Sequence, residues 1–183
     1  ESVRLYALEM KGALHHALLR FTNARHRFDL GRYGSALSVL LEVDALLAQS
    51  AIEFWPEAVE LQLAHTWLRI GQTARALPSV LREDDASPPR LRATRRQLRI
   101  ELAQLFPSAA PDLPPMKEIA ADTRRLVPGL EGSGITVWIS TLRGLPAAAI
   151  VDEAPALADQ ALRRERFGLA LAALARHADA TAQ

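Results

Sequence analysis

The chain of 183 residues contains no cysteine, few aromatic residues and almost no net charge. Without cysteine it can form no disulfide, no thiolate metal site and no cysteine nucleophile. A formal net charge of +1 provides no overall field that would attract nucleic acid or a membrane surface. No apolar run reaches the ~18 residues of a membrane span, so we expect a cytoplasmic protein with no membrane contact.

Motifs that carry chemistry are also missing from the sequence. His15 and His16 are adjacent, so on a helix they point about 100° apart and do not share a metal ion. No HExxH or GxSxG pattern occurs, and "GLEGSG" (129–134) lacks both the Lys of a phosphate-binding loop and the preceding strand of a dinucleotide site. We therefore predict no catalytic activity, no metal and no cofactor.

The residues that are present favour helices. Apolar residues make up 49% of the chain, with Ala and Leu dominant, and aromatic residues only 5%. Apolar spacing and Pro or Gly boundaries predict an all-α fold of about 7–8 helices. The run "ITVWIST" (135–141) is rich in β-branched residues and is typical of either a strand or a helix. We favour a helix because the sequence offers no second strand to pair with it.

Proline clusters suggest how these helices are grouped. The segment "PSAAPDLPP" (107–115) is the most Pro-rich stretch, and it predicts helical repeats over 1–107, a connector over 108–115 and further repeats over 116–183. The chain begins with Glu and not with Met, so we expect it to be part of a longer protein.

A spacing of forty residues recurs along the chain. Gly31, Ala36 and Leu37 are followed forty residues later by Gly71, Ala76 and Leu77. A Gly permits the left-handed conformation that ends one helix, and a small Ala lets the next helix cross it closely. We predict a third copy of this turn at Gly144 and Ala149, and we regard the similar spacing after Gly168 as chance.

The segment "LQLAHTWLRIGQTARALPSVL" (61–81) carries small and large apolar residues in a known order. In the positions of Leu63, Ala64, Trp67, Gly71 and Ala76 it resembles a tetratricopeptide repeat. Residues 14–85 follow this pattern, although the spacing of forty is longer than usual and is similar to irregular repeats of large bacterial transcription regulators and signalling ATPases. The resemblance implies a solenoid of stacked helix pairs, serving as a protein-interaction or effector-sensing module of a bacterial regulator.

The resemblance also implies where a partner would bind. First helices of each repeat line a concave groove, and in this chain the lining residues would be Phe21, Arg25, Phe28, Leu61, His65, Leu68 and Arg69. Apolar and cationic groups together suit a protein or peptide partner of acidic character.

An alternative comes from "RLRATRRQLRIE" (90–101). On a helix, Arg92, Arg95, Arg96 and Arg99 fall within about 100° of one another and would form a stripe able to contact the phosphates of a nucleic acid. A solvated helix face neutralised by nearby carboxylates has the same pattern, and no aromatic residue alternates with the arginines for base stacking.

Overall fold

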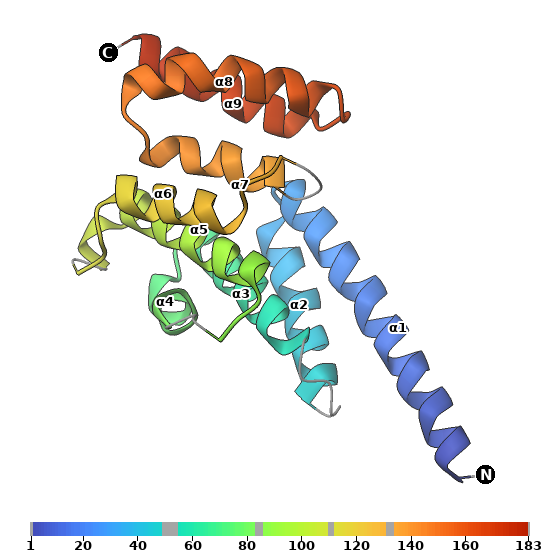
Figure 1. Ribbon diagram of the computed structural model, residues 1–183. Coiled ribbons are helices and arrows are strands. Elements are labelled where there is room, and N and C mark those ends of the chain that lie inside the picture. Colours follow the sequence, from blue (N-terminus) through green and yellow to red (C-terminus); the bar gives the residue numbers. More distant parts are fainter. Residues whose placement is uncertain (1, 49–54, 83–85, 110–111, 131–133, 183) are drawn as a thin grey trace. The chain divides into compact units, whose positions relative to one another are not determined.

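A computed structural model describes residues 2–48, 55–82, 86–109, 112–130 and 134–182. Within these ranges the chain is all-helical, as predicted, with nine α-helices instead of the expected 7–8 and no strand (Figure 1). They are α1 (Ser2–Asp29), α2 (Tyr33–Ala48), α3 (Trp55–Arg69), α4 (Thr73–Leu81), α5 (Pro89–Leu105), α6 (Met116–Leu126), α7 (Gly134–Thr141), α8 (Ala147–Leu162) and α9 (Phe167–Thr181). Two short 3-10 turns, η1 (Pro107–Ala109) and η2 (Leu142–Gly144), follow α5 and α7.

The chain divides into two compact units, Glu1–Arg82 and Glu83–Gln183. The boundary therefore precedes α5, whereas the sequence led us to expect it in the Pro-rich connector after that helix. The reason is that α5 packs extensively against α6, on the other side of the connector. The Pro-rich stretch separates two helices that belong to one unit.

The first unit is built from antiparallel helices that pack in chain order. Helix α1 packs against α2, α2 against α3 and α3 against α4, and α1 also contacts α3. Leu40, Val43 and Leu63 lie in its core together with Phe21 of α1. Leu18 is 39% exposed, because the buried stripe of α1 is centred on Ala17, Phe21 and Ala24.

The forty-residue spacing marks two equivalent turns in this unit. Gly31 and Gly71 have φ angles of 74° and 78°, in the left-handed region that favours glycine. After α1, the N–H of Gly31 donates to the carbonyl of Phe28 at 2.9 Å. After α3, the N–H of Gly71 donates to the carbonyl of Leu68 at 3.1 Å. Both turns are Schellman caps, and Gly71 has the backbone role that the repeat predicts.

The third turn of this kind lies at Glu165 and not at Gly144. Glu165 has φ 55°, and its N–H donates to the carbonyl of Leu162 at 2.9 Å. The N–H of Arg166 donates to the carbonyl of Ala161, also at 2.9 Å, which completes the same cap between α8 and α9. Five residues after Glu165 comes buried Ala170, as buried Ala36 and Ala76 follow Gly31 and Gly71.

Gly144 has a different structural role from the one we predicted. It ends η2, and a Cβ added there would lie 2.6 Å from the carbonyl oxygen of Met116 and 2.7 Å from the Cβ of Ala120. Glycine is needed at this position because the backbone of η2 lies directly on α6. The prediction of a third repeat turn at Gly144 is therefore wrong.

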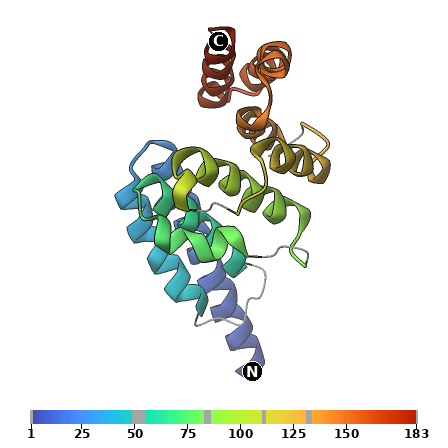
Figure 2. The ribbon, with the colours of Figure 1, turned by 90° about the vertical axis from the view of Figure 1, so that its left-hand side faces the viewer.

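The second unit is held together around α7 and η2. Residues 135–141 are helical, as we favoured, because Ile135, Ile139 and Leu142 bury one apolar face against α8 and α9. Figures 1 and 2 show α8 and α9 side by side as a hairpin. A second small cluster joins Ile100 of α5 to Ile119 of α6.

A single arginine links three elements of the second unit. Arg124 of α6 donates from Nε to Oγ1 of Thr141 at 2.9 Å and from Nη1 to Glu153 of α8 at 2.7 Å. Its guanidinium carbon lies 4.4 Å from the ring centroid of Trp138, and the indole N–H of Trp138 donates to the carbonyl of Val127 at 2.8 Å. These contacts fix α7 between α6 and α8.

Candidate protein-interaction site

Two of the expected groove residues meet in the structure. The ring of Phe28 on α1 and the ring of His65 on α3 have centroids 4.4 Å apart. The ring centroids of Phe28 and Tyr33 lie 5.1 Å apart, with the rings edge to face. Helices α1 and α3 are therefore in contact at this point.

Three other expected groove residues are not accessible to a partner. Phe21 lies in the core of the first unit, and Leu61 and Leu68 are each 1% exposed. Ala24 and Ala64 are also buried, and such small side chains allow the surrounding helices to approach closely and leave no open space between them. The expected apolar groove is therefore closed at Phe21, Leu61 and Leu68.

The two cationic members of the expected set differ in exposure. Arg25 is exposed on α1, whereas Arg69 at the end of α3 is half-buried. With the apolar lining buried, these side chains do not combine into the apolar and cationic groove that we predicted.

The four-arginine stripe on α5 is not exposed as a set either. Arg95 is 0% exposed, and its Nη1 lies 3.4 Å from Oγ of Ser87. The Arg96 side chain is 20% exposed and lies 3.8 Å from Asp122 of α6, while Arg92 and Arg99 are half-buried. The expectation of a continuous phosphate-binding stripe is therefore wrong at Arg95, because the α5 face that carries it is packed inside the protein.

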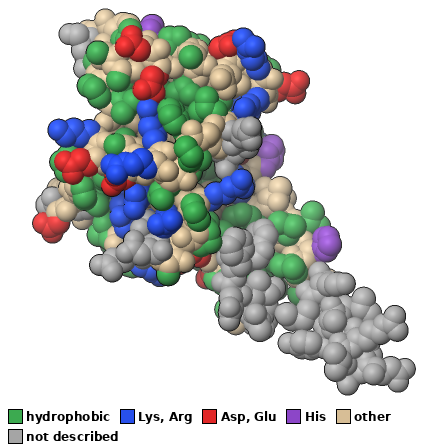
Figure 3. Space-filling view, viewed as in Figure 1, with side chains coloured by type: hydrophobic (Ala, Val, Ile, Leu, Met, Phe, Trp, Pro, Cys, Tyr) green, Lys and Arg blue, Asp and Glu red, His purple; other side chains and the backbone are tan. Residues whose placement is uncertain are grey.

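Figure 3 shows Lys and Arg side chains gathered over the α5 and α6 part of one face, with Asp and Glu side chains beside them. Mixed charge of this kind gives little attraction for a polyanion.

A polar cavity of about 430 Å³ lies along α1 and α2 of the first unit. Arg20 donates from Nε to Nε2 of His16 at 3.3 Å and also contacts Glu42. Arg27 donates to Oδ1 of Asn23 at 2.7 Å, which holds its guanidinium in place. The lining residues are His16, Leu19, Arg20, Asn23, Arg27 and Val39.

Sequence reasoning missed this cavity although a signal was present. His16, Arg20, Asn23 and Arg27 recur at spacings of four, three and four, which places them on one helix face. That face lies on the opposite side of α1 from Arg25, the residue that the repeat pattern pointed to.

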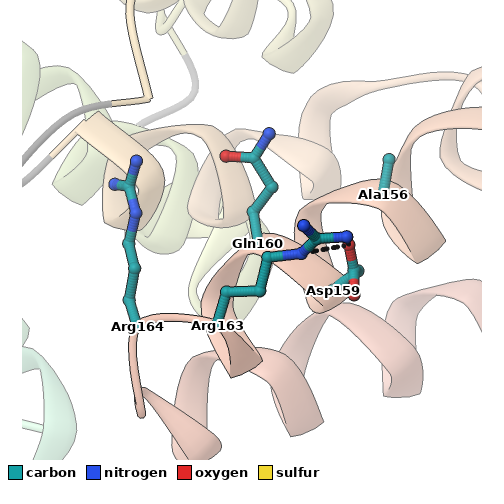
Figure 4. Close-up of a pocket in the computed structure, with 5 residues that line it drawn as sticks. All are labelled: Ala156, Asp159, Gln160, Arg163 and Arg164. Carbon is teal, nitrogen blue, oxygen red and sulfur yellow. Dashed lines mark hydrogen bonds and ion pairs between the residues drawn. The ribbon is translucent and has the colours of Figure 1, made fainter.

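Another cavity, of about 440 Å³, lies at the end of α8 (Figure 4). Arg163 is turned back onto Asp159, with 2.9 Å between its Nε and Oδ2 of the carboxylate. Arg164 donates to the carbonyl of Leu130. Because both arginines already have partners, this cavity has less cationic character than its residue types suggest.

The outer face of α9 carries large apolar side chains that are exposed to solvent. Phe167, Leu171 and Leu174 are 67%, 70% and 45% exposed, and their spacing of four and three places them on one face. The inner side of α9 is also apolar, but it consists of small buried residues, including Ala170 and Ala173, that pack within the second unit. We call Phe167, Leu171, Leu174 and the exposed Ala178 the α9 stripe.

Among the described residues, no group of three His, Asp or Glu side chains is placed to hold a metal ion. Within the same ranges, every helix is too short or too polar to cross a membrane.

No protein-family model, curated protein or solved structure matches this chain. Among the described residues, the α9 stripe and the α1–α2 cavity each offer a surface for binding.

Proposed function

We propose that the chain is a helical scaffold that binds a protein partner through the α9 stripe. The observation that carries this proposal is the exposure of Phe167 and Leu171, about two thirds of each side chain, on a face where no charged residue interrupts the stripe. Soluble proteins rarely leave a contiguous set of large apolar side chains in water unless a partner covers them.

The architecture supports a scaffold role. Three helix hairpins, α1–α2, α3–α4 and α8–α9, share the same cap and the same buried Ala five residues later. Repeated hairpins are typical of tetratricopeptide-like solenoids, in which the last hairpin carries a polar outer face, so an apolar outer face on α9 favours a partner that covers it. A non-catalytic, regulatory module of a larger bacterial protein fits this arrangement and is part of the proposal.

A second candidate function is recognition of an acidic peptide or effector in the α1–α2 cavity. The observation that favours it is Arg27, whose guanidinium is held at the cavity by the neutral side chains of Asn23 and Ser35, whereas Arg20 already contacts the Glu42 carboxylate. Guanidinium groups fixed in this way bind carboxylates with little loss of side-chain freedom.

Affinity capture from the source organism tests both candidates with one set of baits. The Leu171→Glu bait should lose a partner that the wild-type chain and the Ala156→Glu control, which adds the same charge on exposed α8, both recover. A partner of the cavity should instead be lost from an Arg27→Glu bait and kept by the Leu171→Glu bait. Equal recovery by all four baits would contradict both candidates.

A further inference from the structure

A small cavity of about 210 Å³ lies within the second unit, where α5, η2, α8 and α9 come together. Its polar lining consists of Gln104 of α5, Arg143 of η2, and Arg176 and Asp179 of α9. These side chains come from parts of the chain that lie far apart in the sequence. The cavity shares no lining residue with the α9 stripe or with the α1–α2 cavity, so it can hold a ligand of its own.

Gly144 positions Arg143 at this cavity. Because Gly144 carries no Cβ, η2 lies directly on α6, and the preceding Arg143 reaches α5. There its Nη1 lies 3.4 Å from Oε1 of Glu101, which is a buried carboxylate. Arg143 is itself half-buried. The protein therefore fixes one positive charge in the cavity wall.

Helix α9 adds a cation and an anion to the same cavity. Arg176 and Asp179 have i and i+3 spacing, which makes them neighbours on the helix surface. Nη1 of Arg176 lies 3.4 Å from Oδ2 of Asp179, a longer distance than the ~2.7–2.9 Å of a strong charge-assisted hydrogen bond. Asp179 is exposed, and an ion pair of this kind contributes little in water. Both side chains can therefore turn to a ligand at small cost.

The charges around the cavity match a ligand that carries one charge of each sign. Arg143 and Arg176 are positive. Their carboxylate neighbours, Glu101 and Asp179, are negative, so the charges of the four side chains sum to zero. We infer that the cavity binds a small α-amino acid. The α-carboxylate of this ligand accepts hydrogen bonds from the guanidinium groups and from the amide of Gln104, and its α-ammonium group donates to Asp179.

The same charges disfavour other small anions. A dicarboxylate or an inorganic phosphate would bring about two negative charges beside Glu101 and Asp179, and like charges at short distance repel. A monocarboxylate would draw Arg176 away from Asp179 and offer that carboxylate nothing in exchange. An α-amino acid offers a positive and a negative group on one carbon, which suits Arg176 and Asp179 together.

The remaining lining is apolar and limits the size of the ligand. Leu145 and Ile150 pack against the core of the second unit, and Ala147 and Ala180 present only methyl groups to the cavity. At ~30 Å³ per water molecule, the cavity has room for about seven waters, which is close to the number of non-hydrogen atoms in valine. A small apolar side chain fits this space, whereas an aromatic side chain is too large for it.

Isothermal titration calorimetry of the purified chain with L-valine tests the inference. We expect binding with a dissociation constant on the order of 100 µM, as suits a ligand of this size. Isovalerate lacks the ammonium group of valine and isobutylamine lacks its carboxylate, so each should bind at least about tenfold more weakly. Isovalerate that binds as tightly as L-valine would overturn the amino-acid assignment. Absence of binding by L-alanine, L-valine and L-leucine up to about 10 mM would overturn the site itself.

Two substitutions on α9 separate the roles of the charges. Arg176→Gln should weaken the binding of L-valine at least about tenfold. Asp179→Asn should weaken L-valine by a similar factor but should not weaken isovalerate, which has no ammonium group to donate to residue 179. Arg125→Gln and Asp122→Asn are the matched controls, because these residues form an ion pair with the same spacing on α6 and do not line the cavity. Equal losses in the controls would overturn the assignment.

Filling the cavity gives a test that does not depend on charge. Ala147→Leu, in the first turn of α8, should occupy the space of the ligand's side chain and abolish detectable binding. Ala148→Leu, at the exposed neighbouring position, is its control and should bind L-valine as the wild type does. Circular dichroism checks that both variants keep their helix content. Wild-type affinity of Ala147→Leu for L-valine would place the ligand elsewhere and overturn the inference.

The outcomes separate this inference from the proposed function. Leu171→Glu changes the α9 stripe and not the cavity lining, so it should bind L-valine as the wild type does. A chain that binds L-valine but captures no protein partner would retain this inference and lose the proposed function. A chain that captures a partner but binds no amino acid would retain only the proposed function.

Discussion

Glu165 provides the most direct test of the hairpin geometry, because its backbone is left-handed at φ 55° where the two equivalent turns have glycine. A side chain in this conformation costs about 1–2 kcal/mol. Glycine removes that cost but gives the unfolded chain more freedom, which offsets about 0.5–1 kcal/mol. Glu165→Gly should therefore stabilise the protein by about 0.5–1 kcal/mol.

Urea denaturation measures this difference. With a typical m value of about 1.5–2 kcal/mol/M, the unfolding midpoint should rise by about 0.3–0.6 M while m stays constant. Glu165→Ala is the matched control, because it removes the carboxylate but keeps the Cβ, and we expect it to change stability by less than about 0.5 kcal/mol. If glycine stabilises no more than alanine does, residue 165 is not left-handed and the equivalence of the three turns is refuted.

Three further substitutions test packing, each by urea denaturation of the purified chain. Ala76→Leu should overpack the crossing of α3 and α4 and lower the free energy of unfolding by about 1–3 kcal/mol. Arg75→Leu, at the exposed neighbouring position, should be close to neutral. Equal effects of the two substitutions would refute the close crossing. Gly144→Ala should cost about 1–3 kcal/mol, because its Cβ meets the α6 backbone, and a neutral result would contradict that contact. Arg124→Ala should cost about 2–3 kcal/mol through loss of its bonds to α7 and α8, and a stability unchanged from wild type would show that these bonds do not hold α7.

The sequence predicted the positions of the helices well, because nearby proline and glycine residues mark where helices begin and end. Pro56 lies in the first turn of α3, and Gly31 and Gly71 end α1 and α3 as expected. Even the β-branched run at 135–141 is helical, because burial of its apolar face outweighs its strand propensity. The third turn was missed because Glu165 adopts a conformation that sequence patterns assign to glycine.

The binding surface was harder to predict because periodicity identifies apolar residues but does not show which of them a neighbouring helix covers. Leu61 and Leu68 have the spacing of a groove and are buried, whereas Leu171 and Leu174 have the spacing of a core and are exposed. Helix α9 is apolar on both sides, so its sequence alone could not indicate which side faces water. The same difficulty applies to charged residues. Arg95 lies within a run of arginines and was expected at the surface, but it is buried.

The stacking of Arg124 on Trp138 makes the second unit observable by itself. The chain has three tryptophans, and Trp138 is the one that lies within residues 83–183. Replacing Trp55 and Trp67 by Phe would leave a single tryptophan, which can be excited selectively, at the junction of α6, α7 and α8, while circular dichroism continues to report on every helix. Comparing the two signals during denaturation would show whether the halves of the chain unfold together or one after the other.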